Sequence, residues 1–298
     1  MNSALAPIAL FAYNRPEHLL QCLRSLKENV LAAKSTLYVY SDGKKSDASD
    51  DDIKKIEECR RIIKQESWCQ EVIVIEQDQN LGLAASIIRG VTDVINRHGK
   101  IIVLEDDLIF SNFFLNYMND CLDKYSGMEN IYSVNGYMFP IGVEERNTFL
   151  LPYTSTWGWA TWKSKWDLFT SEIPEEDKQL LAGDPLLKDR FNLSDYDYTS
   201  MLGFKNNSWG IKWYYSVFVR NGLNVFPTHS LVSHIGNDGS GTNHTGQGDK
   251  IVFDKNNSIL IKIENKLNLK YLSLYQSFFT NPKKNKIKSF IRKTLRKS

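Results

Sequence analysis

Three consecutive carboxylates, Glu105, Asp106 and Asp107, stand directly after the apolar run at 101–104. A strand made of such a run is covered on both faces, so the acids that follow it lie at the edge of a sheet. Mg²⁺ and Mn²⁺ take oxygen ligands, and one or two carboxylates suffice for a cation that arrives with a diphosphate. The alternative is that the acids cap the helix expected to begin near Asn112. A cap needs a single acid, so the triplet favours a metal-binding edge.

Polar residues also follow the apolar runs at 8–12, 37–40 and 72–75. In open α/β sheets the ligand sits outside the carboxyl ends of the strands, so we expect these residues to converge on one crevice. Carboxylates gathered there repel each other unless a cation or a hydrogen-bonding ligand is present. Ordinary turns are the open alternative for the residues at 42–43 and 80–82. The candidate crevice residues are Tyr13, Asn14, Arg15, Asp42, Asn80 and Gly82.

Helical patterns alternate with these apolar runs. We expect helices at 16–26, 51–66, 84–97 and 113–125, where apolar residues recur at helical spacing. This alternation predicts an α/β fold with a mostly parallel, Rossmann-like sheet flanked by helices. The sequence lacks both the GxxxxGK[ST] and the GxGxxG motifs, which disfavours P-loop and dinucleotide-binding proteins.

The pattern changes after residue 131, where helical and extended signals mix and aromatic residues concentrate. Six of the seven Trp lie between 157 and 213. We therefore expect one continuous domain with a nucleotide-binding half at 1–135 and a mixed half at 136–280 that completes the site. The last segment, 281–298, is expected to be a basic tail, because it holds eight Lys and Arg and no acid.

Composition excludes several classes of protein. The 298 residues are 42% hydrophobic and 24% charged, which is ordinary globular usage. Apart from the tail the chain is mildly acidic, so we do not expect nucleic-acid binding. Four cysteines without CxxC spacing indicate free thiols in a reducing compartment, and the N-terminus has no basic region or cleavage pattern typical of a secretory signal. We therefore expect a cytoplasmic protein.

The motifs at 12–16, 41–43, 80–82 and 103–107 together resemble those of GT-A-fold glycosyltransferases, the family-2-type bacterial sugar transferases in particular. They also show kinship to the N-acetylglucosaminyltransferase I type, which carries Glu-Asp-Asp. The resemblance covers roughly 7–245. It implies that Asp42 reads the nucleotide, that Glu105 and Asp106 contact the nucleotide or donor sugar, and that Asp107 binds Mn²⁺ or Mg²⁺ under the diphosphate.

The second half carries the resemblance further. The segment at 155–162 is similar to the Trp-Gly-Trp segment near the donor sugar and acceptor, and flat indoles suit the apolar faces of sugar rings. We expect Trp157 and Trp159 to contact sugar, and Trp162 and Trp166, four residues apart, to form a core-facing helix stripe. The loop at 238–245 resembles a bacterial C-terminal signature, so His244 is a candidate metal or phosphate ligand. A solvent-facing histidine is the open alternative.

The catalytic base is expected to be a carboxylate of the second half. Inverting enzymes of this fold use a carboxylate to deprotonate the acceptor hydroxyl. Relatives often carry an acid beside a Trp near Trp209, but residues 209–213 contain none. Asp195 and Asp197 are the nearest upstream acids, and we select Asp197. The alternative is that both residues belong to a loop or a helix cap.

Residues 283–297 carry apolar side chains at spacings of three and four, which predicts a basic amphipathic helix. Such a helix suits an anionic membrane surface and would bring the enzyme to a lipid-linked acceptor. A frayed soluble terminus is the alternative.

The resemblance thus implies a metal-dependent, inverting glycosyltransferase. It would use a nucleotide-diphosphate sugar and a glycan or lipid-linked acceptor, in bacterial surface polysaccharide or glycan synthesis. A sugar nucleotidyltransferase and a non-catalytic carbohydrate-binding protein are the alternatives.

Overall fold

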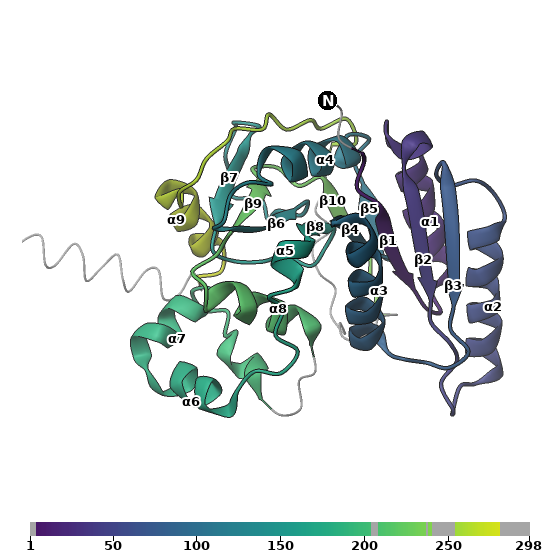
Figure 1. Cartoon of the computed structure of the whole chain (residues 1–298), viewed down its shortest axis with the longest axis horizontal. Coiled ribbons are helices and arrows are strands. Elements are labelled where there is room, and N and C mark those ends of the chain that lie inside the picture. The colour runs from purple at the N-terminus through teal and green to yellow at the C-terminus, as the bar shows by residue number, and fades with distance from the viewer. Residues whose placement is uncertain (1–3, 204–207, 237, 240–253, 281–298) are drawn as a thin grey trace, which may run out of the picture.

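The computed structural model describes residues 4–203, 208–236, 238–239 and 254–280 of the chain. Within these residues a large sheet runs through the molecule, in the strand order β3-β2-β1-β4-β8-β6-β9-β7, and β5 and β10 form a separate pair (Figure 1). The strands are β1 Ile8–Ala12, β2 Thr36–Ser41, β3 Glu71–Glu76, β4 Lys100–Glu105, β5 Leu108–Phe110, β6 Ile131–Asn135, β7 Thr148–Leu151, β8 Trp159–Trp162, β9 Leu223–Pro227 and β10 Val232–His234.

Helices cover both faces of this sheet. The α-helices are α1 Pro16–Lys27, α2 Asp50–Lys64, α3 Leu83–His98, α4 Phe114–Lys124, α5 Lys163–Trp166, α6 Glu175–Gly183, α7 Pro185–Phe191, α8 Trp209–Phe218 and α9 Leu269–Phe278. Short 3-10 helices lie at Ala32–Lys34 and Thr199–Leu202. None of the helices in the described part of the chain has the length and apolar character needed to span a membrane.

The direction of each strand decides which loops can meet. Strands β1 to β4 are mutually parallel, and β8 runs antiparallel to both β4 and β6. Therefore β6 points the same way as β4, and β9 is parallel to β6. The carboxyl ends of β1, β2, β3, β4, β6 and β9 thus lie along one edge of the sheet. This edge carries the candidate site.

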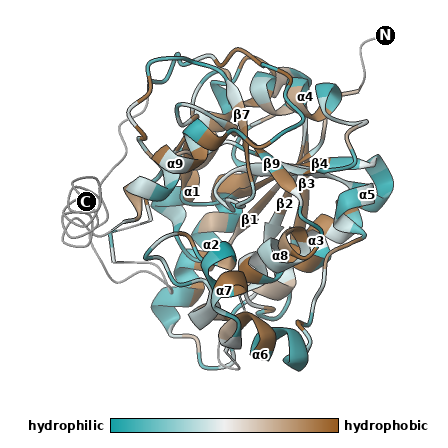
Figure 2. Cartoon of the chain, turned by 90° about the vertical axis from the view of Figure 1, so that its left-hand side faces the viewer, coloured by the Kyte–Doolittle hydropathy of each residue, from teal (hydrophilic) through white to brown (hydrophobic). Residues whose placement is uncertain are grey.

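Two hydrophobic clusters sandwich the sheet. Side chains of α1, α2 and α4 pack on one face, and those of α3, α5 and α8 pack on the other. Alternate side chains of a strand point to opposite faces, so β4 sends Ile102 and Leu104 to the first cluster and Ile101 and Val103 to the second. The central strands, hydrophobic in Figure 2, are therefore buried on both sides.

A third cluster, built mainly from aromatic residues, belongs to the second half of the chain. It joins β7 and β9 to helices α6 to α9, with Phe149, Tyr153, Phe191 and Tyr275 fully or almost fully buried. The mixed second half therefore has a core of its own on a sheet that it shares with the first half.

Local sequence explains where the helices begin. Pro16 occupies the first turn of α1, where its missing N–H costs no hydrogen bond. Ser49 and Asp52 form a reciprocal capping box at the start of α2. Gly82 precedes α3 and Gly99 follows it, both with φ of 76°, a backbone conformation that favours glycine.

The predicted α/β fold is confirmed, and the four strands and four helices expected in the first half all form. The predicted helix stripe of Trp162 and Trp166 is wrong. Trp162 ends β8 and its indole N–H donates to the carbonyl of Leu122 on α4, whereas Trp166 packs in the cluster on the other face. The two indoles lie on opposite faces because a strand, not a helix, holds the first of them.

Candidate active site

The turn between β4 and β5 places Asp106 and Asp107 at the carboxyl edge of the sheet. Their exposed fractions are only 3% and 6%, and Glu105, the last residue of β4, is half-buried. Buried carboxylates need partners, because an isolated charge in a low dielectric is costly. The partners come from two other segments of the chain.

The loop after β1 supplies the first of them. The Arg15 guanidinium pairs with Asp106 through Nη2 and with Asp107 through Nη1, the latter at 2.9 Å. The Tyr13 backbone N–H also donates to Asp106, at 3.3 Å. Although burial disfavours its charged form, the two carboxylates raise the pKa of Arg15, which therefore stays charged. The loops after β1 and β4 therefore meet, as expected, and the Arg15 guanidinium joins them by pairing with both acids.

His234 supplies the second partner, and sequence reasoning missed it. Its Nε2 lies 3.2 Å from Oδ2 of Asp107. Strand β10 pairs antiparallel with β5, which sets His234 opposite Leu108, and the Ile235 N–H donates to the Asp107 carbonyl at 2.9 Å. Gly236 then passes so close that an added Cβ would lie 2.4 Å from the Asp107 carboxylate. Only glycine permits this approach.

The three acids differ in their pKa values because their surroundings differ. Burial and the charges of Asp107 and Asp106 raise the pKa of Glu105 to about 8. Burial raises the pKa of Asp106 to about 6, against the opposing effect of Arg15. Burial acts on Asp107 in the same direction, but the hydrogen bond from His234 and the charge of Arg15 outweigh it and lower its pKa. Asp107 is therefore the acid held most firmly in its charged form.

One oxygen of the Asp107 carboxylate lacks a hydrogen-bond partner among the described residues. Oδ2 of Asp107 is shared by Arg15 and His234, but Oδ1 is buried and makes no hydrogen bond to any described residue. A buried charged oxygen without a partner is a fitting ligand for a divalent cation. The described residues form no group of three or more metal-ligating side chains. Asp107 Oδ1 thus offers a single ligand position for a cation.

Asp42 lies at the end of β2 and holds two neighbouring loops together. Its carboxylate accepts hydrogen bonds from the backbone N–H groups of Gly43, Leu81 and Gly82, and from the Asn80 side chain at 3.0 Å. A Cβ on Gly43 would lie 2.5 Å from the backbone of Gln79. The hydrogen bonds of Asp42 in this structure therefore stabilise the two loops. That Asp42 also binds the nucleotide stays a prediction. Asn14 donates to Asp52 at 3.0 Å.

The two predicted sugar-contacting tryptophans have different environments. Trp157 is half-buried, and its ring stacks on His234 with centroids 4.6 Å apart. Trp159 is fully buried among Trp166, Trp209 and Trp213, so the prediction that it contacts a sugar is wrong. Gly158, with φ of 68°, turns the chain between them. Trp157 therefore stays at the site and Trp159 belongs to the core.

Asn135, the last residue of β6, anchors the loop that carries Trp157. Its Oδ1 accepts from the Ser155 N–H at 3.0 Å, and its Nδ2 donates to the Val225 carbonyl at 3.1 Å. Its own carbonyl accepts from the Tyr117 hydroxyl. Asn135 is fully buried. One side chain thus ties the loop to β9.

We expect Asn135→Ala to destabilise the protein by about 2–3 kcal/mol, because it removes the partners of the half-buried Ser155 N–H and the buried Val225 carbonyl. Urea unfolding followed by circular dichroism measures this loss. Asn256→Ala, which removes an exposed side-chain hydrogen bond to Asn112, is the control and is expected to change stability by less than about 0.5 kcal/mol. Equal effects of the two substitutions would show that the Asn135 anchor is not important.

The remaining predicted residues lie elsewhere. Asp197 accepts from the Thr199 hydroxyl and the Ser200 N–H, at the start of a 3-10 helix. These hydrogen bonds hold Asp197 in its own turn, and its role as base stays a prediction. His244 and the tail at 281–298 lie outside the described residues.

One family model matches part of the chain. The family model "Glycosyl transferase family 2" matches residues 8–124, the segment from β1 to α4 that holds Arg15 and all three acids. This segment is therefore similar to the family that the sequence motifs predicted. The mostly parallel sheet flanked by helices also agrees with the predicted fold class. The search of curated proteins finds no match.

Two solved structures resemble the chain distantly. One is a mannosyltransferase from Pyrobaculum calidifontis in complex with GDP-Man and Mn²⁺, at 12% identity and a TM-score of 0.37, over 66% of this chain and 51% of that one. The other is TarS of S. aureus, at 12% identity and a TM-score of 0.36, over 75% of this chain and 35% of that one. The chain thus spans about half and about a third of their lengths.

Proposed function

We propose that this protein is a glycosyltransferase that moves a sugar from a nucleotide-diphosphate donor to an acceptor hydroxyl with the help of a divalent cation. The observation that supports the proposal is the Asp107 carboxylate. It is buried at the carboxyl edge of the sheet, kept charged by Arg15 and His234, and has one oxygen unused by the described residues. Ligands of α/β sheets bind at this edge.

Asp107 and His234 would hold Mn²⁺ or Mg²⁺, with Asp106 beside them. The cation, when bound, supplies positive charge where the diphosphate leaves. The chain's own contribution is to fix these groups before the donor arrives. Arg15 adds a second positive charge next to the same carboxylates, and preorganised charge of this kind stabilises a developing anion. Trp157, stacked on His234, would offer its exposed edge to the sugar.

The donor nucleoside would lie over the loops that Asp42 joins, in contact with Tyr13, Asn14 and Asn80. We place it there because these loops follow β1, β2 and β3 at the same edge as Asp107. The reaction would be a single displacement with inversion. Asp197 remains the proposed base, with the acceptor half at 136–280 bringing it to the acceptor hydroxyl.

A screen of nucleotide sugars tests the proposal. Thermal unfolding is followed with UDP-, GDP-, dTDP- and CMP-sugars, each with Mn²⁺ or with EDTA, and the products of slow donor hydrolysis are identified. We expect one nucleoside diphosphate sugar to raise the melting temperature in Mn²⁺ only, and to release nucleoside diphosphate. Release of pyrophosphate would instead indicate a nucleotidyltransferase. Binding of sugars without any nucleotide binding would indicate a carbohydrate-binding protein.

The acceptor is proposed to be a glycan or lipid-linked sugar of a bacterial surface polysaccharide, met at the inner face of the cell membrane. The basic segment at 283–297 supports this location, because its Lys and Arg residues suit anionic lipid. Flotation with anionic liposomes, compared between the full chain and a chain truncated after Thr280, tests it. Equal recovery in the soluble fraction would exclude the tail as an anchor.

A further inference from the structure

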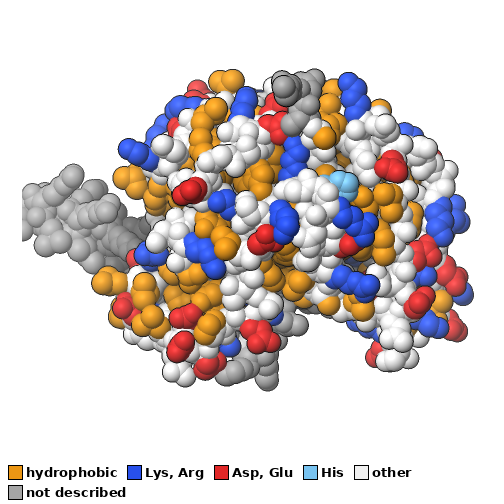
Figure 3. Space-filling view, viewed as in Figure 1, with side chains coloured by type: hydrophobic (Ala, Val, Ile, Leu, Met, Phe, Trp, Pro, Cys, Tyr) orange, Lys and Arg blue, Asp and Glu red, His pale blue; other side chains and the backbone are white. Residues whose placement is uncertain are grey.

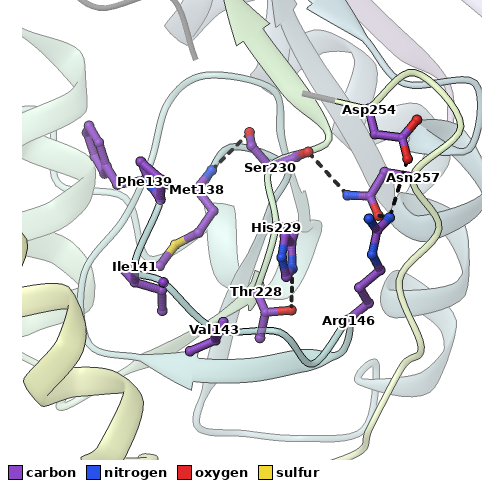
Figure 4. Close-up of a pocket in the computed structure, with 12 residues that line it drawn as sticks. Met138, Phe139, Ile141, Val143, Arg146, Thr228, His229, Ser230, Asp254 and Asn257 are labelled. Carbon is purple, nitrogen blue, oxygen red and sulfur yellow. Dashed lines mark hydrogen bonds and ion pairs between the residues drawn. The ribbon is translucent and has the colours of Figure 1, made fainter. Parts of the chain in front are cut away.

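A pocket lies farther along the same sheet edge, away from the acid cluster. Its volume is about 230 Å³, and the segments that form it follow the carboxyl ends of β6 and β9 (Figure 4). Ligand pockets commonly range from about 300 to 1,000 Å³, so this one has room for a single ring and little more.

The pocket lies near the candidate active site in the chain and is joined to it by packed aromatic rings. The Met138 N–H donates to the Ser230 hydroxyl at 3.1 Å, which binds its two walls together. Ser230 precedes His234 by four residues, so at most about 14 Å of chain separates them. Tyr137 makes edge contacts with both Trp157 and Phe139, at centroid distances of 4.6 and 5.1 Å. A run of aromatic rings thus extends from the active site to the pocket wall.

The two walls differ in character. Met138, Phe139, Ile141 and Val143 form an apolar wall, and His229 and Arg146 lie across from it (Figure 4). The Arg146 guanidinium is already balanced, because it bonds Asn257 at 2.6 Å and lies 3.5 Å from Asp254. The pocket therefore presents one apolar face and one polar face without excess charge. Such a lining suits a neutral ring with hydroxyl groups better than a phosphate.

Hydrogen bonds around Thr228 determine which tautomer the His229 imidazole adopts. The Thr228 hydroxyl donates its one proton to the Glu145 carbonyl, so it must accept from Nδ1–H of His229, 3.3 Å away. Burial and the charge of Arg146 lower the pKa of His229, which favours the neutral ring. Its Nε2 then carries a lone pair and makes no hydrogen bond to any described residue. This nitrogen can accept a hydrogen bond from a hydroxyl group of a ligand.

We propose that this pocket binds one neutral sugar ring of the acceptor, with its apolar face on Ile141 and Val143 and a hydroxyl donating to Nε2 of His229. The proposal rests on the proposed glycosyltransfer, which requires an acceptor with a hydroxyl. It assigns the pocket to acceptor recognition, with the reacting hydroxyl on another ring of the acceptor.

The test uses the full chain and a panel of methyl glycosides of glucose, galactose, mannose, rhamnose and N-acetylglucosamine, titrated by NMR without donor or metal. We expect saturable binding of at least one glycoside, with a dissociation constant in the millimolar range. Val143→Trp, which fills the pocket, and His229→Phe, which removes the acceptor nitrogen, should each weaken it at least about tenfold. His229→Gln, which keeps an acceptor atom, should recover most of the affinity.

Leu260→Trp is the matched control, because it adds the same indole on a side chain that is 73% exposed and does not line the pocket. It should leave glycoside binding unchanged, and circular dichroism should show all variants folded. Absence of saturable binding by every glycoside, or equal binding by Val143→Trp, overturns the proposal. Donor binding in Mn²⁺ is measured separately on the same variants and should not change. A failure of the donor screen therefore remains distinguishable from a failure of the pocket.

Discussion

The Asp107→Asn protein is expected to bind its nucleotide sugar in Mn²⁺ at least about 100-fold more weakly than the native protein, which corresponds to about 2.8 kcal/mol. Asparagine keeps the size of the side chain but removes the charge. It also presents an N–H₂ group to either Arg15 or the cation, neither of which accepts a hydrogen bond. Calorimetric titration with the donor identified by the screen measures the loss.

Asp167→Asn provides the control, because Asp167 is an exposed acid whose ion pair with Lys163 joins neighbouring turns of the same helical segment. It should bind donor like the native protein. A folded Asp107→Asn protein with native affinity would contradict this prediction. It would mean that the acid cluster has only a structural role, in the turn that follows β4. Titration in EDTA separates the metal from the donor, since the difference between the two proteins should then largely disappear.

The part of the site that comes from β1 to β4 could be predicted from the sequence. Apolar runs without alternation indicate strands covered on both faces, and such strands are parallel in α/β proteins. Parallel strands end at one edge, so residues such as Arg15 and Asp106 had to be neighbours although 91 positions separate them. What the pattern could not show is that Arg15 pairs with both acids.

His234 could not be found in the same way. Its position depends on the pairing of β10 with β5, two strands of three residues each that lie more than 120 positions apart. A three-residue strand has no readable periodicity. The signal available was His234 next to the Ile235-Gly236 pair, where a glycine beside a polar residue indicates a close backbone approach. The sequence analysis selected His244, in the glycine-rich loop, instead.

The misplacement of Trp159 has a similar origin. In sequence, Trp157 and Trp159 flank Gly158 symmetrically, and both were expected at the surface of the site. The positive φ of Gly158 ends the loop there, and β8 begins with Trp159 paired to Val103 of the central strand β4. Whether a tryptophan belongs to a loop or to a central strand is set by this long-range pairing, which local spacing does not reveal.

The stability of the metal-free protein is expected to fall as the pH rises from about 5 to about 8, and Glu105 is expected to cause much of the fall. The pKa of its carboxyl is raised to about 8, from an ordinary value of 4.5, by burial and by the charges of Asp107 and Asp106. No described residue pairs with this carboxylate. Because the folded protein holds this proton more tightly than the unfolded chain does, the stability it provides is present at low pH. That stability is lost as the pH rises through the folded pKa.

Glu105→Gln removes this titration, since glutamine is neutral at every pH and can still donate and accept hydrogen bonds in the same place. We expect the variant to gain on the order of 2–4 kcal/mol over the native protein at pH 9 relative to pH 5. Urea unfolding in EDTA at half-unit steps of pH measures the difference. Glu17→Gln, at an exposed position in the first turn of α1, should follow the native curve. A Glu105→Gln protein that loses stability with pH as steeply as the native one would show that Glu105 is charged in the folded state at neutral pH. In that case Arg15 and the hydrogen bonds to Asp106 and Asp107 would have to balance the repulsion within the acid cluster.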